Sequence, residues 1–172
     1  MCASGRFARG RGLVDPNDSS RRRAREVALQ VLYAIDLGEG RGSLAGPAGE
    51  GVEAPASSSP DKVFDAVSAH FEMPEAARAF ALELVQAVQR RLETLDRTIG
   101  EHSANWRIER MAAVDRNILR LGTYELAHTT TPARVILNEA VDLARRFSGD
   151  PSPAFVNGIL DAVARGVREC VP

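Results

Sequence analysis

Apolar residues recur at three- and four-residue spacing in every segment of this chain that could build a core. Such spacing places apolar side chains along one face of an α-helix, whereas a half-buried strand would show strict alternation. A clear stripe lies near the start and consists of Ala24, Val27, Ala28, Val31, Leu32 and Ile35. Aromatic residues make up only 5% of the chain, and runs of β-branched residues are scarce. We therefore predict an all-α fold, a compact helical bundle without strands.

Proline, glycine and helix-capping residues divide the periodic segments into six or seven predicted helices. The first should open after the capping residues 17–20 and end at Gly38, since glycine commonly follows a helix C-terminus. The segment that opens at Pro74 reaches Ile99, either as one long helix or as two helices with a break. The other predicted starts are Pro60, Ile108, Pro132 and Pro153.

The 172 residues are enough for one domain that folds without disulfides or metals. We expect residues 1–20 to be a disordered basic leader, residues 21–172 to form the single domain, and residues 38–59, rich in Gly, Ala, Ser and Pro, to be a flexible loop. Cys2 and Cys170 lack disulfide or zinc spacing, which suits a reducing compartment and a cytoplasmic location. No apolar run approaches the roughly 18 residues of a membrane span.

The net charge of -1 hides a strong asymmetry along the chain. Residues 1–25 contain seven arginines against Asp15 and Asp18, a balance of +5, so the other 147 residues sum to -6. The positive end could attract a polyanion such as a nucleic acid.

Four arginines, Arg21, Arg22, Arg23 and Arg25, lie within five residues at the predicted start of the first helix. Their charges repel one another and oppose the positive end of the helix dipole, so an anion should compensate them. A ligand such as RNA would do so. The alternative is a solvated helix start that frays and binds nothing.

Aromatic and amide side chains add to the candidate RNA surface. Tyr33 follows Arg22 by eleven residues, which places it on nearly the same helix face, and a ring beside arginines suits base stacking. A half-buried ring at the helix margin is an equal alternative. Phe155 and Asn157 follow a loop and could also contact RNA. We expect Asn138 to be a buried, hydrogen-bonded amide and Gly158 to permit close helix packing.

The same search finds no catalytic site. His70, His102 and His128 are far apart and lack metal spacing, and no glycine-rich loop could cradle a phosphate. We predict a protein that is not an enzyme and holds no metal or cofactor.

Four segments, taken in order, carry a resemblance to a known family. They read RRRAREVALQVLYAIDL, NWRIERMAAVDRNILRLGTYEL, PARVILNEAVDLARRF and FVNGILDAVAR. Each segment alone is unspecific, but the four together, over residues 21–167, closely resemble the NusB family of bacterial transcription antitermination factors.

The resemblance implies two small helical bundles that bind boxA-type single-stranded RNA together with the ribosomal protein NusE. This would occur within an RNA polymerase elongation complex that contains other Nus factors, chiefly on ribosomal RNA operons. By position, it implies RNA contacts at Arg21, Arg22, Arg23, Arg25, Tyr33, Phe155 and Asn157. It implies a NusE contact at Asp115, with Arg116 and Arg120 beside it.

Two other functions remain as alternatives. A protein-interaction module, or a homodimer whose RNA surface is covered, would have the same segments. An RNA cytosine methyltransferase can carry a NusB-like N-terminal domain, but a chain of 172 residues leaves no room for its catalytic domain. The loop 148–153 departs from the family pattern because it holds two prolines and Asp150.

Overall fold

The structure is a computed structural model that describes residues 16–38, 59–103 and 106–169. Within these ranges it contains seven α-helices, one 3-10 turn and no strand, so the predicted all-α fold is confirmed. The elements are α1 (Pro16–Gly38), α2 (Pro60–Ser68), α3 (Glu75–Arg90), α4 (Leu92–His102), η1 (Ile108–Arg110), α5 (Ala113–His128), α6 (Ala133–Phe147) and α7 (Ser152–Glu169). No helix in the described ranges is both long and apolar enough to span a membrane.

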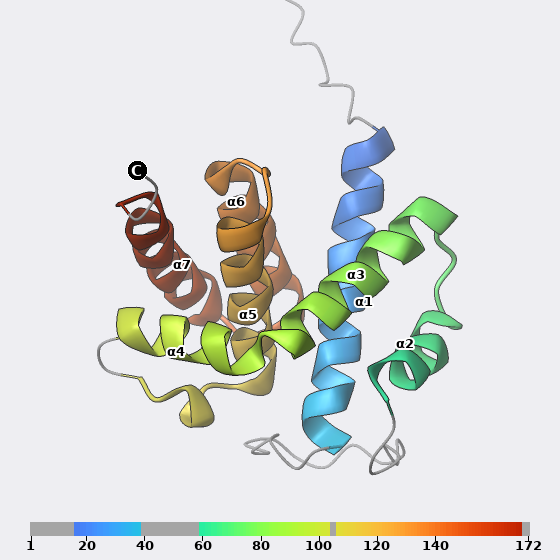
Figure 1. Cartoon of the computed structure of the whole chain (residues 1–172), viewed down its shortest axis with the longest axis horizontal. Helices are drawn as coiled ribbons and strands as arrows, with labels where there is room; N and C mark the ends of the chain where they lie inside the picture. Colours follow the sequence, from blue (N-terminus) through green and yellow to red (C-terminus); the bar gives the residue numbers. More distant parts are fainter. Residues whose placement is uncertain (1–15, 39–58, 104–105, 170–172) are drawn as a thin grey trace, which may run out of the picture.

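The helices form two groups that share α1 as their common wall (Figure 1). In the first group, α2 and α3 pack on α1. In the second group, α5, α6 and α7 pack on one another, and α4 closes the end of this bundle against α5 and α7. Because α1 and α3 also contact α5, the two groups are joined along the length of α1.

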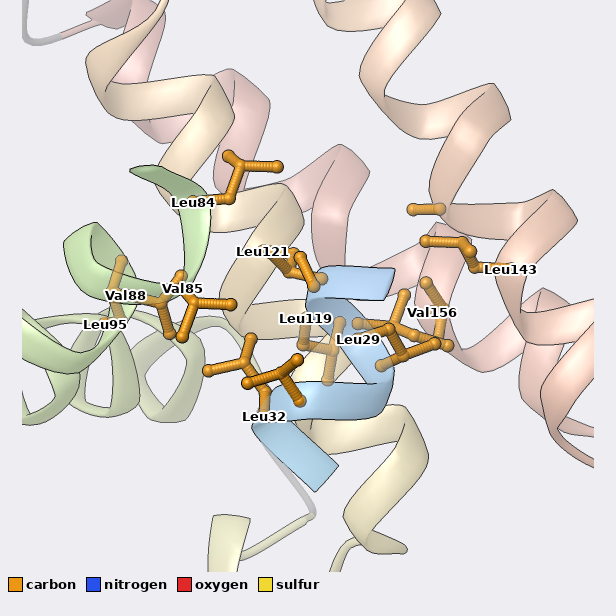
Figure 2. Packing of buried hydrophobic residues seen from close by; sticks show 14 of the residues in the cluster. Leu29, Leu32, Leu84, Val85, Val88, Leu95, Leu119, Leu121, Leu143 and Val156 are labelled. Atoms are coloured by element: carbon orange, nitrogen blue, oxygen red, sulfur yellow. The ribbon is translucent and has the colours of Figure 1, made fainter. Parts of the chain in front are cut away.

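A continuous apolar core runs through both groups. Figure 2 shows Leu29 and Leu32 of α1 in a core to which α3, α4, α5, α6 and α7 also contribute side chains. The labelled neighbours are Leu84, Val85, Val88, Leu95, Leu119, Leu121, Leu143 and Val156. Every member of the stripe predicted between Ala24 and Ile35 is buried, which confirms that α1 packs with this face. Removing a leucine from such a core typically costs about 2–5 kcal/mol.

Two helix starts differ from the prediction, and one open alternative is decided. α1 starts at Pro16, so residues 16–20 belong to the helix and not to a leader. The segment after Pro74 is two helices, since the backbone at Arg91 leaves the helical range. The helix expected from Ile108 starts only at Ala113, because the backbone at Met111 and Ala112 is extended. The remaining leader residues 1–15 and the connection 39–58 lie outside the described residues.

Close helix packing occurs at a glycine other than the expected one. A Cβ atom on Gly122 of α5 would lie 2.7 Å from Cδ1 of Leu160, so α5 and α7 can approach closely there. A Cβ atom on Gly158 would meet no atom within 4 Å. The expectation for Gly158 was therefore wrong, because this residue faces away from the neighbouring helices and is exposed.

Candidate RNA and partner interfaces

The arginine cluster at the start of α1 divides into exposed and buried members. Arg21 and Arg22 are exposed, Arg23 is half-buried, and Arg25 is buried. The division follows from helix geometry, because the four residues point in different directions around α1, while α5 packs on one side of it and side chains of α6 reach the same side.

Arg25 belongs to the interior of the fold. Its Nε and Nη2 atoms donate to the two carboxylate oxygens of Glu125 on α5, at 2.8 and 2.7 Å. Nη1 lies 3.7 Å from a carboxylate oxygen of Glu139, and the arginine side chain is only 4% exposed. The expectation that Arg25 contacts RNA is corrected, since its charge is matched within the protein and no phosphate could reach it.

The guanidinium group of Arg22 is bound by carboxylates on its inner side and exposed to solvent on its outer side. Its Nη2 donates to Oε1 of Glu139 at 2.7 Å and lies 3.5 Å from Asp142. The Glu139 side chain is 7% exposed, whereas 51% of the Arg22 side chain faces solvent. A buried carboxylate therefore fixes the position of a guanidinium group whose outer side is accessible.

Two arginines from α6 join the same surface, although the sequence analysis did not select them. Glu26 of α1, itself buried, accepts a hydrogen bond from Arg23 at 2.8 Å and another from Arg146. Arg145 bonds to Asp142 at 3.1 Å. The side chains of Arg145 and Arg146 are 66% and 59% exposed. Both arginines lie in the last turn of α6, where basic residues are common because they interact favourably with the helix dipole, so their position alone does not indicate a ligand.

We call these arginines, together with exposed Arg21 at the start of α1, the arginine rim; it consists of Arg21, Arg22, Arg23, Arg145 and Arg146, and Arg21 lies on its α3 side over the ring of Phe80. Its five positive charges meet three nearby carboxylates, those of Glu26, Glu139 and Asp142. The rim therefore keeps an excess of two positive charges after its internal pairing. A surface of this kind suits a polyanion, since charge-assisted hydrogen bonds from arginine to phosphate are short and strong.

A polar groove leads from the rim across α6 to the start of α7. It brings together Arg22 and Asn157, two predicted RNA contacts that lie far apart in the sequence. Its other lining residues are Val135, Asn138, Glu139, Val141, Asp142, Arg145, Asp150, Pro153 and Ala154. Asn138 is exposed, so the expectation that it is a buried amide was wrong. Both asparagine amides can present donors and acceptors to a ligand.

The two predicted aromatic contacts lie in different surroundings. Tyr33 is half-buried about 16 Å along α1 from Arg22, and the face between them is covered because Glu26 and Leu29 are 4% and 2% exposed. Arg22 and Tyr33 therefore do not form one open surface along α1. Phe155 is half-buried at the start of α7, where its ring packs against Trp106 at 5.6 Å between centroids.

Arg116 and Arg120, expected beside the partner contact, are instead buried around Asp36 of α1. Arg116 donates from Nη2 to Oδ2 of Asp36 at 2.9 Å, and Arg120 donates from Nη1 to the same carboxylate at 3.1 Å. The side chains of the three residues are at most 4% exposed. The partner role is corrected for both arginines, which serve to attach α5 to α1.

Arg120 bridges two carboxylates. Besides Asp36, it bonds to both oxygens of Asp96 on α4, at 2.7 and 2.8 Å. Burial by itself lowers the pKa of Arg120, but the hydrogen bonds and charges of Asp96 and Asp36 outweigh burial and raise that pKa above its ordinary value. The guanidinium therefore stays charged and locks α1, α4 and α5 together.

Asp115, at the start of α5, is 7% exposed. Its Oδ2 accepts a hydrogen bond of 2.8 Å from Ser152, the first residue of α7, and the Ser152 hydroxyl lies 2.9 Å from that of Ser148. Oδ1 of Asp115 is buried and takes no hydrogen bond from the described part of the chain. A partner contact at Asp115 stays a prediction.

An all-helical domain with a basic rim and a polar groove is typical of helical proteins that bind polyanions. The chain belongs to the NusB family, whose model matches residues 22–165.

Curated relatives support this membership over most of the chain. The transcription antitermination protein NusB of Solibacter usitatus is 41% identical over 157 residues, which cover 88% of this chain and 92% of the relative. The protein of the same name from Anaeromyxobacter sp. (strain Fw109-5) is 44% identical, with 86% and 91% covered.

Solved structures have a similar fold. The solution structure of NusB from Aquifex aeolicus has a TM-score of 0.68 and 29% identity, covering 89% of this chain and 93% of that one. A crystal structure of the antitermination factors NusB and NusE in complex with dsRNA has a TM-score of 0.68 and 30% identity, covering 86% and 98%.

Proposed function

We propose that this chain is an RNA-binding transcription antitermination factor. It binds boxA-type single-stranded RNA together with the ribosomal protein NusE. In the cytoplasm it joins RNA polymerase and other Nus factors and promotes processive elongation, chiefly of ribosomal RNA operons. It acts by binding and carries out no chemical step.

The observation that carries this proposal is the construction of the arginine rim. Glu139 and Glu26 lie beneath it, almost fully buried, and fix the guanidinium groups of Arg22 and Arg146 in place. The outer side of each group is exposed and can bind phosphate oxygens. Because the rim is positioned before RNA arrives, little side-chain freedom is lost on binding.

The rim supplies affinity, whereas base recognition must come from other groups. Contacts between arginine and phosphate carry no sequence information. The exposed amides of Asn138 and Asn157 lie in the groove that begins at Arg22, where they can bind base edges. We expect NusE to add the remaining specificity, as the known complex of NusB, NusE and dsRNA supports.

The proposed NusE contact is the start of α5 near Asp115. We do not include Arg116 or Arg120, since both are bonded to buried Asp36.

Anisotropy of a labelled boxA-like RNA, with and without NusE, tests this function. We expect NusE to increase RNA affinity, and the double variant R21A/R22A to weaken RNA binding while NusE binding stays unchanged. The matched control is R165A, which removes an exposed arginine on α7 that is also paired within the protein. Absence of RNA binding both with and without NusE would contradict the proposal. An RNA-insensitive dimer in sedimentation would favour the interaction module instead.

A further inference from the structure

Trp106 is the only tryptophan of the chain and is 57% exposed. The next most exposed large apolar side chains of the described residues, Val135 and Leu37, reach 38% and 37%. A large aromatic surface left in water is unfavourable unless it serves a contact.

The ring of Trp106 is held in place by its surroundings. Its backbone N–H donates to the carbonyl of Ser103 at 2.8 Å, and the buried Ser103 hydroxyl donates back to the Trp106 carbonyl at 2.9 Å. The ring packs edge-to-face on Phe155 of α7, with 69° between the ring planes. An edge-to-face pair uses the face of only one of its rings, so aromatic surface remains open beside the pair.

The charges around Trp106 favour an anionic ligand. Trp106 lines a hollow between α4 and η1 together with the exposed arginines Arg97 and Arg107. Two carboxylates, Asp96 and Glu109, line the same hollow. Asp96 is already bonded through both oxygens to Arg120, which leaves Glu109 as the only carboxylate of this lining without a bidentate partner.

The aromatic pair also continues the proposed RNA surface. The groove that contains Arg22 is lined on α7 by Pro153, Ala154 and Asn157, and Phe155 lies between Ala154 and Asn157 in the sequence. Because Phe155 also contacts Trp106, the first two turns of α7 connect the groove with the aromatic pair.

We propose that Trp106 and Phe155 form a stacking site for an unpaired RNA base, with Arg97 and Arg107 beside it for the flanking phosphates. This inference rests on the proposed function and adds a second contact region to it. A stacked base must leave its helix, so the site selects single-stranded over double-stranded RNA.

The single tryptophan gives a direct test on the full-length protein. A boxA-like single-stranded RNA should quench the Trp106 fluorescence, and a duplex of the same sequence should quench it much less. Within a series of oligonucleotides that each carry one abasic position, quenching should be lost at one position. Anisotropy of the labelled RNA, measured in parallel, reports binding independently of the tryptophan.

Variants complete the test. W106A should weaken binding of single-stranded RNA by about 5- to 100-fold, the usual range for one stacked base, and W106F should restore part of the loss. L37A, which removes another exposed apolar side chain, is the matched control and should bind RNA like the unaltered protein. Equal urea midpoints of W106A, L37A and the unaltered protein would exclude a folding defect.

Two results would overturn the stacking site and leave the proposed function intact. One is RNA binding by anisotropy without any change in tryptophan fluorescence and with normal affinity of W106A. The other is quenching by NusE alone but not by RNA, which would assign Trp106 to a protein contact. Absence of RNA binding in anisotropy would instead overturn the proposed function and the stacking site together.

Discussion

Arg25 of α1 and Glu125 of α5 form two parallel hydrogen bonds, 2.8 Å from Nε to Oε1 and 2.7 Å from Nη2 to Oε2. Neither side chain is more than 4% exposed. The pair joins the α1–α3 group to the α4–α7 bundle at a point where water cannot solvate either charge. Removing either side chain would therefore leave the charge of the other one buried without its partner.

The first prediction concerns this pair. R25A should lower the free energy of unfolding by about 3–5 kcal/mol, because Glu125 would remain buried without its partner. Urea unfolding measures the loss. R165A removes an exposed, paired arginine of α7 and should change stability by less than about 0.5 kcal/mol. Equal stability of the two variants would show that the buried pair contributes nothing.

Local sequence patterns predicted the helices well because each pattern lies within one element. The stripe from Ala24 to Ile35 is buried as predicted, and the starts near Pro60 and Pro74 are placed within a residue or two. The family resemblance placed these helices in the correct fold. The errors at Pro16 and Ile108 concern helix ends, where short-range signals are weakest.

The pairing of the arginines could not be predicted in this way. The sequence indicated that negative charge compensates the arginine cluster, and carboxylates of the protein itself supply part of that charge. Glu125 and Glu139 lie 100 and 117 positions away from their arginine partners. An arginine bonded to such a residue and one that awaits a phosphate look alike in sequence, so only the packing of α1 on α5 and α6 separates Arg25 from Arg22.

The second prediction concerns Asp36. D36N should lower the free energy of unfolding by about 3–5 kcal/mol, because buried Arg116 would lose the charge of its carboxylate partner Asp36 and Arg120 would lose one of its two carboxylate partners. D96N should cost less, since the Asp96 side chain is 25% exposed and water can replace it. Urea unfolding compares the two. A larger loss in D96N would contradict the assignment of Asp36 as the centre of the network.

The third prediction compares two glycines inside helices. G158A should raise the free energy of unfolding by up to about 1 kcal/mol, because alanine favours a helix and the new methyl group meets no atom. G122A gains the same propensity but forces buried Leu160 to move, which costs about 1–3 kcal/mol. The midpoint of thermal unfolding should therefore be higher for G158A, and lower for G122A, than for the unaltered protein. The reverse order would contradict the close contact between Gly122 of α5 and Leu160 of α7.

The fourth prediction concerns pH. Partial desolvation, and then the positive charge of Arg91, lower the pKa of the largely exposed His128 below its ordinary value. Between that lowered pKa and about 6.5 the unfolded chain binds more protons than the folded one, so stability falls as the pH drops through this interval. The urea midpoint should decrease less on acidification in H128Q than in the unaltered protein. R91A should raise the His128 pKa in an NMR titration, and an unchanged pKa would exclude Arg91 as a cause.

The fifth prediction tests whether Arg145 and Arg146 belong to the RNA surface. If each guanidinium releases one counterion from single-stranded RNA, removing one should reduce the slope of log K against log salt by about 0.7. R145A and R146A should each show this change, and R146K should restore the slope because it keeps the charge. R165A should leave the slope unaltered, since Arg165 lies on α7 beside its own partner Asp161. Weaker binding of R146A with an unchanged slope would mean that Arg146 acts only by holding Glu26, and the rim would then consist of α1 residues and Arg145.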